Sequence, residues 1–336
     1  MIPACIPKEH LHGVDHMGLH ASSCLIVGAG LSGLVAARTL KTAGLHVTVL
    51  DKSRGVGGRL ATRRLGNGRF DHGAQFFTVR DPRFQQAVDD WIAHGVVHPW
   101  YTEGGHTRYR AENGMNSLAK DLAAGLSDIR LDAPVQRLEL ANAGWRAVMA
   151  DGSTVDASML LVTAPAPQTL VLAGSALPDE LTGQLRQITF DPCFALLVEL
   201  DGPSRVPAPG YTRPDAGPIA WIADNVQKGI SPAPQAALTI HARPDFTRDH
   251  LEDDLATVQQ SLIEAAEPYF GESHVLNAQL HRWRYSQPVH TTAEPCLFSA
   301  ASVPVAIAGD AFGGPRVEGA YLSGLAAAEV LRQHAR

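Results

Sequence analysis

The chain has 336 residues, 45% of them hydrophobic, and a formal net charge of -6. A chain of this length can bury a large core and suggests about two domains. The net negative charge gives no global field that would attract nucleic acid or an anionic membrane. Seven arginines gather between Arg54 and Arg83, and we interpret them as cofactor-facing and solvated side chains rather than as a polyanion-binding patch.

Cysteine and histidine spacing excludes several kinds of site. The four cysteines form no C-x-x-C pair, and the fifteen histidines include no H-E-x-x-H, so neither a metal site nor a redox dithiol is expected. No apolar run reaches the ~18 residues of a membrane span. Residues 1–21 are polar and His-rich without a signal-peptide core, and we expect a disordered or tag-like extension. These features predict a cytoplasmic protein without a nucleic-acid partner or membrane span.

The first recognisable unit predicts dinucleotide binding. A short apolar strand, Cys24–Val27, ends at Gly28-Ala-Gly-Leu-Ser-Gly33, and a helical pattern runs from there to Gly44. A second strand, His46–Leu50, then delivers Asp51. This is the strand–turn–helix–strand arrangement of a Rossmann unit with a carboxylate at its far end. The alternative is a similar packing unit that binds no phosphate.

Each glycine of this turn has a separate physical task. Gly28 allows the tight turn, Gly30 lets the backbone approach a pyrophosphate, and Gly33 lets helix and strand pack closely. The helix N-terminus offers free N–H groups and partial positive charge to phosphate. Asp51 can accept hydrogen bonds from a ribose diol.

The next segment indicates which dinucleotide binds. Asp51, five residues, Gly57-Gly58-Arg59 and then Thr62 resemble the extended motif of the flavin amine oxidase superfamily, although most members carry Glu at the position of Asp51. That resemblance implies FAD. Arg69–Phe77 is similar to the superfamily segment that passes beside the flavin ring. Gly73 and Ala74 suit close backbone approach, while Gln75 either faces the ring or hydrogen-bonds a loop.

Further along, periodicity predicts a helix over Asp81–His94 and another from Asn116. The pattern predicts a three-strand meander over Val135–Leu140, Trp145–Met149 and Val155–Leu161. The resemblance to FAD-binding folds implies that the chain then returns to the main sheet at Val162–Pro165.

The pattern changes between Pro167 and Gln287, where a second layer is expected. Strands are predicted at Cys193–Leu200, Ile219–Ala223, Ala236–His241 and Val275–Trp283. The proline-rich stretch 201–218 is expected to be a long loop, and Thr247–Glu267 one amphipathic helix. Successive strands with a covering helix predict an antiparallel sheet of the α+β kind.

The C-terminal part returns to the first unit. Val303–Ala308 reads as a buried strand, and Gly309-Asp310 ends it. Arg316-Val-Glu-Gly-Ala-Tyr-Leu-Ser-Gly324 then opens the last helix. This resembles the closing motif of the superfamily, in which the Asp binds the ribityl chain and the helix N-terminus points at flavin N1 and O2.

The fold class predicted is α/β: a Rossmann-type FAD/NAD(P)-binding domain with an inserted α+β substrate domain built on an antiparallel sheet. The predicted FAD domain comprises residues 22–90, 112–166 and 288–336, and the substrate domain residues 91–111 and 167–287. The predicted cofactor-binding residues are Gly28, Gly30, Leu31, Ser32, Gly33, Asp51, Lys52, Gly58, Arg59, Ala74, Gln75, Phe76, Val135, Gly309, Asp310, Glu318, Gly319 and Ala320.

Several pieces narrow the resemblance to the renalases, especially their bacterial members. They are Asp51-Lys-Ser-Arg-Gly-x-Gly-Gly-Arg59, Asp71-x-Gly-Ala-Gln-x-Phe77, Trp221-Ile-Ala-Asp-Asn-x-x-Lys228, Ile240-His241 and Arg282-Trp-Arg-Tyr285. The resemblance implies an oxidase of the 2- and 6-dihydro isomers of NAD(P), which transfers hydride to flavin N5 and reduces O2 to H2O2. This chain departs from the family after His241, where Ala242–Phe246 lacks the usual tryptophan.

The candidate catalytic residues are Trp221, His241, Trp283 and Gln75. Two tryptophans could sandwich a planar dihydropyridine, and His241 could bond its carboxamide. The structural alternatives are a core position for each tryptophan and a structural hydrogen bond for the histidine. The absence of lysine between 229 and 336 counts against ordinary amine oxidation. An amine oxidase or desaturase for another small substrate and a non-catalytic flavin sensor remain as alternatives.

Overall fold

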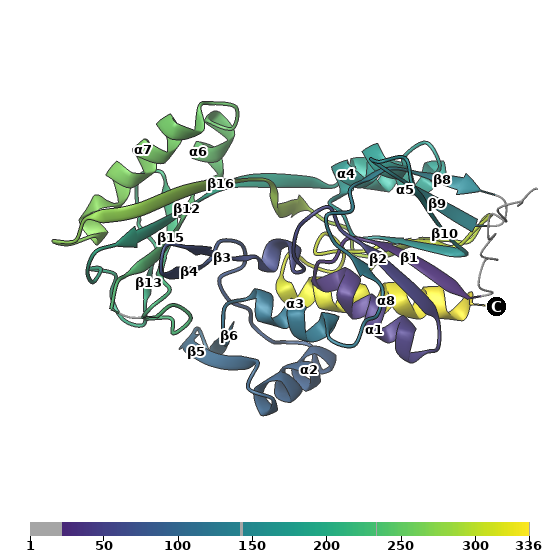
Figure 1. Ribbon diagram of the computed structural model, residues 1–336, viewed down its shortest axis with the longest axis horizontal. Coiled ribbons are helices and arrows are strands. Elements are labelled where there is room, and N and C mark those ends of the chain that lie inside the picture. Colours follow the sequence, from purple (N-terminus) through teal and green to yellow (C-terminus); the bar gives the residue numbers. More distant parts are fainter. Residues whose placement is uncertain (1–21, 142–143, 233, 336) are drawn as a thin grey trace, which may run out of the picture.

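The computed structural model describes residues 22–335 apart from 142–143 and 233; the predicted N-terminal extension therefore lies outside the described residues. Figure 1 shows two lobes joined by two long strands, β12 (Thr189–Leu200) and β16 (Val275–His290). The N- and C-terminal parts of the chain build one lobe together, while the residues between β12 and β16 build most of the other. No helix in the described part of the chain is long and apolar enough to cross a bilayer.

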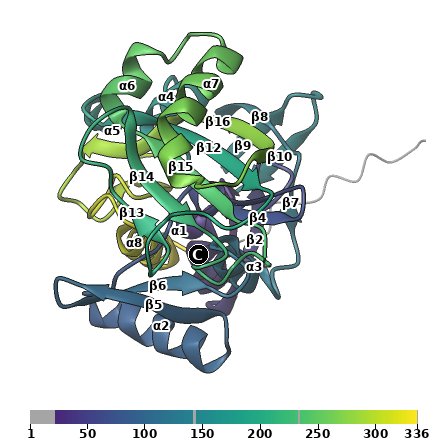
Figure 2. The same cartoon turned by 90° about the vertical axis from the view of Figure 1, so that its left-hand side faces the viewer.

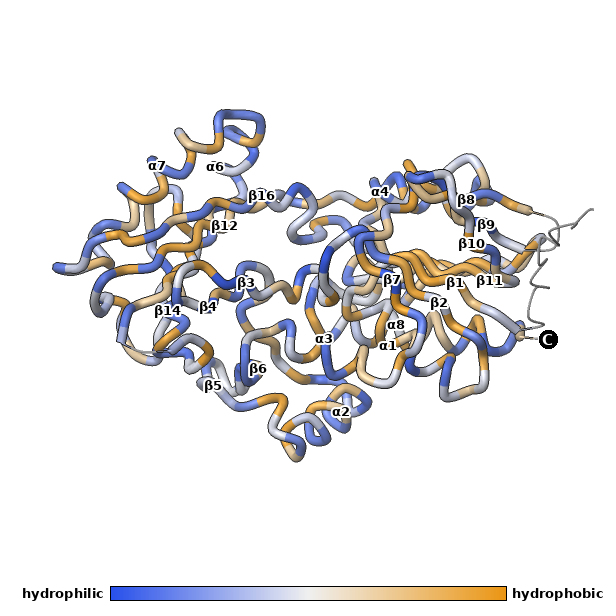
Figure 3. Tube along the Cα trace, in the orientation of Figure 1, coloured by the Kyte–Doolittle hydropathy of each residue, from blue (hydrophilic) through white to orange (hydrophobic). Residues whose placement is uncertain are grey.

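A six-stranded sheet forms the centre of the first lobe, in the order β17-β18-β11-β1-β2-β7, and its pairs are parallel except for β17 with β18. Its strands are β1 (Ser23–Val27), β2 (His46–Leu50), β7 (Ile129–Arg130), β11 (Met159–Val162), β17 (Leu297–Ser299) and β18 (Val305–Ile307). The central strands are mostly apolar, as the hydropathy colours of Figure 3 show, because both faces are covered.

Each face of this sheet has its own core. Ile26 and Val49 pack towards the side that carries α1 (Leu31–Thr42), α3 (Asn116–Ala123) and α8 (Val317–Gln333). Leu25 and Leu50 pack towards the meander and the pair α4 (Ala166–Ala173) and α5 (Asp179–Arg186). The predicted combination of a Rossmann-type layer with an antiparallel sheet is confirmed.

The meander differs from the prediction at its third strand. It consists of β8 (Val135–Ala141), β9 (Gly144–Met149) and β10 (Thr154–Ala157). The stretch predicted as one strand over Val155–Leu161 is divided at Ser158, because its hydroxyl donates to the carbonyl of Ser23 at 2.8 Å. The chain therefore enters the main sheet at β11, earlier than the predicted return at Val162.

The second lobe is a five-stranded antiparallel sheet in the order β13-β14-β15-β12-β16. Its remaining strands are β13 (Tyr211–Thr212), β14 (Ile219–Asp224) and β15 (Ala237–Ala242). Strand β13 lies within the stretch 201–218 that was predicted as a loop throughout. That prediction was wrong for these two residues. Strand β13 forms because it pairs with β14, and two residues are too few to show a strand pattern in the sequence.

The helix predicted over Thr247–Glu267 is two helices. They are α6 (Pro244–Asp249) and α7 (Leu255–Ala266), followed by the 3-10 turn η2 (Glu267–Tyr269). Asp254 begins α7, since its carboxylate accepts the N–H of Thr257 at 3.0 Å. The helices cover the outer face of the sheet, where Leu196 and Ile240 join their core.

Two hairpins and one helix lie between the lobes. They are β3 (Thr62–Leu65) with β4 (Gly68–Asp71), β5 (Val97–Glu103) with β6 (His106–Ala111), and α2 (Pro82–Ala93), which agrees with the helix predicted there. The short 3-10 helix η1 (Gly58–Leu60) precedes the first hairpin. Figure 2 shows the β5–β6 hairpin and α2 below the five-stranded sheet.

Candidate functional site

The turn between β1 and α1 has the backbone that its glycines predict. Gly28 has a φ of 115°, and a Cβ there would lie 2.3 Å from the hydroxyl of Thr163. A Cβ on Gly33 would lie 2.0 Å from the carbonyl oxygen of Gly28. These two positions therefore require glycine for folding.

Gly30 differs from its neighbours because a Cβ there would meet nothing within 4 Å. It precedes α1 with no side-chain cap, so the first N–H groups of that helix lack intrahelical partners. The buried hydroxyl of Ser32 also has no hydrogen-bond partner among the described residues. Open space, free donors and a positive helix end fit a diphosphate, as the predicted FAD site requires.

Asp51 follows β2 and faces this turn. One carboxylate oxygen accepts the N–H of Ala29 at 2.6 Å, and the other accepts the N–H of Ser53 at 2.7 Å. The carboxylate thus holds the phosphate turn from the far strand, in the position predicted for a ribose ligand. Lys52 beside it is exposed.

The Gly-Gly-Arg loop lies against the same turn. Gly57 donates to the carbonyl of Ala29 at 2.9 Å, and a Cβ on Gly58 would lie 3.4 Å from the Cα of Gly30. The guanidinium of Arg59 donates two hydrogen bonds to Asp310, at 2.7 and 2.6 Å. Two predicted cofactor residues from opposite ends of the chain therefore meet as a bidentate ion pair.

The closing motif reaches the site through α8. A Cβ on Gly324 would lie 2.4 Å from the carbonyl oxygen of Ser32, so α8 crosses α1 at very short range. Gly309 has a φ of 150° and open space beside it. The carboxylate of Glu318 accepts the N–H groups of Arg80 and Asp81 at 2.6 and 2.8 Å. Through one carboxylate oxygen, the side chain of Glu318 fixes the segment that enters α2.

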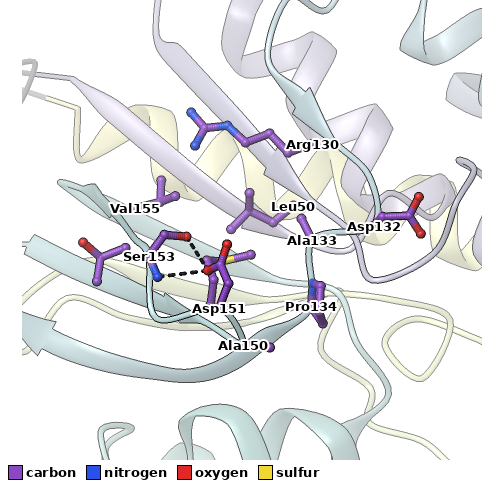
Figure 4. A pocket seen from close by; sticks show the side chains of 11 residues that line it. Leu50, Arg130, Asp132, Ala133, Pro134, Ala150, Asp151, Ser153 and Val155 are labelled. Carbon is purple, nitrogen blue, oxygen red and sulfur yellow. Dashed lines mark hydrogen bonds between the residues drawn. The ribbon is translucent and has the colours of Figure 1, made fainter.

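The backbone of Gly319 and Ala320 forms the first turn of α8, where a Cβ on Gly319 would lie 2.0 Å from the carbonyl of Gly314. Val135, at the start of β8, is half-buried. A hollow of about 460 Å³ begins at its neighbours Ala133 and Pro134, and Figure 4 shows the side chains that line it. Its walls include Leu50, Arg130 and Asp151 but none of the predicted cofactor residues, so we do not assign FAD to it.

The segment after β4 is folded onto Arg59. Ala74 donates to the carbonyl of Arg59 at 2.8 Å, and a Cβ on Gly73 would lie 2.0 Å from that oxygen. The amide nitrogen of Gln75 donates to the carbonyls of Asp71 and Gly73, but its Oε1 is buried without a partner in the described part of the chain. Phe76 lies beside Trp221, with ring centroids 5.7 Å apart.

The inner face of the five-stranded sheet carries the other candidates. Trp221 pairs with His241, and the same row continues through Ala195 to His281 on β16. Trp283 lies two residues beyond His281 and therefore on the same face. The predicted residues are thus brought to one surface, turned towards the first lobe.

The two tryptophans do not form a sandwich. Three strand-to-strand steps of about 4.8 Å each separate them, which is too far to enclose one ring. Trp283 instead stacks on His72 at 5.4 Å and donates to the carbonyl of His72 at 2.9 Å. Trp221 stacks on Tyr211 at 4.7 Å, and its buried indole N–H lacks an acceptor among the described residues.

The histidines of this site are neutral near pH 7. Burial lowers the pKa of His241 to about 4, although its contact with the carbonyl of His72 opposes the shift. Burial, followed by the proximity of His281, lowers the pKa of His72 to about 3. Burial also lowers the pKa of His281. The surface is therefore aromatic and weakly basic, with uncharged imidazoles.

Sequence reasoning missed the buried ion pair between Lys228 and Asp71. The two groups are 2.6 Å apart and both side chains are 0% exposed. Asp71 also accepts from the hydroxyl of Thr62 and the N–H of Met115. Lys228 belongs to a motif that the sequence shows, but nothing in the sequence indicates that it pairs with Asp71, which lies on another hairpin.

Comparisons with known proteins agree with this geometry. Residues 26–91 match the NAD(P)-binding Rossmann-like domain, and residues 92–332 match the family described as flavin containing amine oxidoreductase. The chain is 26% identical to renalase from Mus musculus over 341 residues, which covers 93% of this chain and 99% of that one. The predicted resemblance to renalase is thus confirmed.

Two other relatives share smaller parts or only the fold. Protoporphyrinogen oxidase 2 from Arabidopsis thaliana is 42% identical over 65 residues, which is 19% of this chain and 13% of that one. A solved structure of putrescine oxidase, a triple mutant, superposes with a TM-score of 0.69 at 14% identity, covering 93% of this chain and 99% of that one.

Proposed function

The chain belongs to the flavin containing amine oxidoreductase family, and from this premise we propose that it is an FAD-dependent oxidase of the 2- and 6-dihydro isomers of NAD(P), with NAD(P)+ as its product. Family membership gives the coarser statement, a flavin-dependent oxidoreductase. When bound, FAD would accept the hydride of the substrate and pass its electrons to O2, which yields H2O2. The substrate half of the proposal depends on the residues around the ring.

One uncharged row of side chains on the inner face of the five-stranded sheet is the observation that supports this substrate. The row from Trp221 through His241 to His281 contains no carboxylate, and burial holds its imidazoles uncharged. A dihydropyridine gives up hydride without losing a proton, so it needs no general base. A planar, uncharged ring also suits aromatic walls.

Two buried polar atoms without a hydrogen-bond partner among the described residues suit the carboxamide of such a ring. The buried indole N–H of Trp221 can donate to a carbonyl, and the buried Oε1 of Gln75 can accept from an amide nitrogen. Phe76 follows Gln75 in the sequence, and its ring centroid lies 5.7 Å from that of Trp221. A carboxamide would satisfy one donor and one acceptor that otherwise carry a desolvation cost.

Anaerobic flavin reduction tests the proposal. FAD-loaded protein is mixed in turn with isomerised NADH, with pure 4-dihydro NADH as the matched control, and with a set of amines. We expect the isomer fraction alone to remove the absorbance of oxidised flavin rapidly. Reduction by amines but not by the isomers would show an amine oxidase instead, and reduction by neither would favour a flavin-binding sensor.

A further inference from the structure

The β5–β6 hairpin is fixed against the edge of the five-stranded sheet, as Figure 2 shows. The indole of Trp100 donates to the carbonyl of Pro209 at 2.8 Å. The hydroxyl of Tyr211 donates to Glu103 at 2.9 Å, and Tyr101 stacks on Tyr211 with centroids 4.4 Å apart. One side of the hairpin therefore faces the region beside Trp221.

Arg108 and Arg110 lie on that side. They are two residues apart on β6, so their side chains share one face. The guanidinium of Arg108 is 5.8 Å from the ring centroid of Phe76. Arg110 packs against Gly229, where a Cβ would lie 3.2 Å from its Nη2. The two side chains are only 15% and 18% exposed.

Both arginines have buried N–H groups without acceptors. Nε of Arg108 and Nη1 of Arg110 have no hydrogen-bond partner in the described part of the chain. The Glu112 carboxylate is 3.8 Å from Arg110, beyond hydrogen-bond range, and it lies 2.6 Å from His98. Buried donors that lack acceptors are costly, so two of them side by side favour a ligand rich in acceptors.

The charges around the hairpin point to an anionic ligand. Glu103 is shared between Arg108 and Arg213, at 3.0 Å from each. The charged side chains on and beside the hairpin form one cluster. Its cations are Arg108, Arg110, Arg213 and Lys228, and its carboxylates are Glu103, Glu112 and Asp71. One positive charge is therefore in excess, among aromatic rings that strengthen an electrostatic contact by excluding water.

We propose that Arg108 and Arg110 form an anion subsite that binds the diphosphate of a dinucleotide substrate. The inference rests on the proposed function, because the ligand is the non-reacting half of that substrate. Its location is consistent: Phe76 touches both Arg108 and Trp221, so the diphosphate would bind next to the residues proposed for the carboxamide. Nη1 and Nη2 of Arg108 already donate to Glu103 and to the carbonyl of His106. The donors offered to phosphate oxygens are therefore Nε of Arg108 and Nη1 of Arg110.

Equilibrium binding to the FAD-loaded protein tests the subsite without turnover. The probes are ADP-ribose, which has the diphosphate but no nicotinamide, and inorganic pyrophosphate, measured by calorimetry. The variants are Arg108→Met and Arg110→Met, with Arg110→Lys as the charge-conserving version. Arg137→Met is the matched control, since its side chain is 55% exposed and pairs with Glu139 on β8.

We expect Arg108→Met and Arg110→Met each to weaken ADP-ribose binding about tenfold or more, Arg110→Lys to retain part of it, and Arg137→Met to match the wild type. In steady state, KM for the dihydro-dinucleotide should rise while kcat and the KM of dihydronicotinamide riboside stay unchanged. If either methionine variant loses its flavin, a competition experiment with the wild-type protein tests the subsite instead. Pyrophosphate should compete with the dihydro-dinucleotide and not with dihydronicotinamide riboside.

Unchanged ADP-ribose binding in both methionine variants, or equal competition of pyrophosphate with dinucleotide and riboside, would overturn the subsite. The proposed function fails separately. Arginine-dependent binding of ADP-ribose without flavin reduction by dihydro-NAD would retain the subsite and reject that substrate, whereas rapid reduction with arginine-independent binding would reject the subsite alone.

Discussion

The ammonium nitrogen of Lys228 lies 2.6 Å from a carboxylate oxygen of Asp71, and neither side chain is exposed. The pair joins the turn after β14 to the end of β4, and so ties the five-stranded sheet to the segment that carries Gly73 and Gln75. The main-chain carbonyl of Asp71 also accepts from the side chain of Gln75. One buried pair thus positions the residues predicted to lie beside the flavin ring.

Removing one member of this pair should be costly. Lys228→Met leaves the Asp71 carboxylate buried without its cation, and we expect the free energy of unfolding to fall by about 3–5 kcal/mol. The double variant with Asp71→Asn should recover part of that loss. Denaturant unfolding measures both effects, with Lys120→Met on the exposed side of α3 as control. A loss below about 1 kcal/mol in Lys228→Met would contradict the argument.

Gly30 should separate cofactor binding from folding. Gly30→Ala places a methyl where the protein has open space, so the flavin-free protein should unfold within about 1 kcal/mol of the wild type. FAD binding should nevertheless be lost or strongly weakened, because the methyl occupies the space predicted for the diphosphate. Calorimetric titration with FAD gives the affinity.

Two further glycine variants serve as controls for Gly30→Ala. Gly183→Ala in α5 also meets nothing within 4 Å and should keep both stability and FAD binding. Gly33→Ala should destabilise the fold itself, since its Cβ would clash with the carbonyl of Gly28. If Gly30→Ala binds FAD normally, the diphosphate lies elsewhere.

Trp221 should matter for the substrate and not for the fold. Its indole N–H has no acceptor among the residues that the structure describes, so Trp221→Phe should cost little stability while raising KM for the dihydronicotinamide about tenfold. Trp145→Phe is the matched control, because that indole N–H is also buried and also lacks an acceptor in the described part of the chain, but it lies in the meander core. Equal KM values for the two variants would exclude the proposed contact.

Acid should destabilise the protein through its buried histidines. His72 and His241 have pKa values of about 3 and about 4 in the folded state, below the ordinary 6.5. Between the folded-state pKa values and 6.5, the unfolded chain binds protons that the native protein does not. The free energy of unfolding is therefore highest above pH 6.5 and falls as the pH drops towards 4. The loss should be on the order of a few kcal/mol.

Unfolding titrations at several pH values measure this slope. His72→Gln and His241→Gln should each flatten it, whereas His274→Gln, at a site 85% exposed, should not. A slope that is the same in all four proteins would show that other groups control the acid transition. The rate of flavin reduction should stay flat between pH 6 and 8, because the pKa values of His72 and His241 lie well below that range.

Local pattern predicted the elements whose signals are local. The phosphate turn, α2, the start of α3 and the main strands of both sheets follow from glycine spacing and apolar period. The break at Ser158 and the division between α6 and α7 coincide with side-chain hydrogen bonds, between Ser158 and Ser23 and from Thr257 to Asp254. Periodicity does not register such contacts.

The candidate site was predictable as a set of residues and not as an arrangement. Sequence motifs identified Trp221, His241 and Trp283 as candidates. The strand register of the five-stranded sheet places all three on one face, but the two tryptophans are too far apart to enclose one ring. The pairs Arg59–Asp310 and Lys228–Asp71 join segments 251 and 157 residues apart. No local pattern specifies such partners, because folding alone brings them together.

Thr189 and His290 stand opposite each other at the base of the β12–β16 ribbon, and the threonine hydroxyl lies 2.6 Å from the imidazole. The hundred or so residues between them therefore leave and re-enter the nucleotide-binding lobe at a single point. Because both ends of this segment lie together, its length and sequence can change while the strands of the nucleotide-binding sheet keep their order. One cofactor scaffold could in this way acquire a new substrate by replacing a single contiguous stretch of gene.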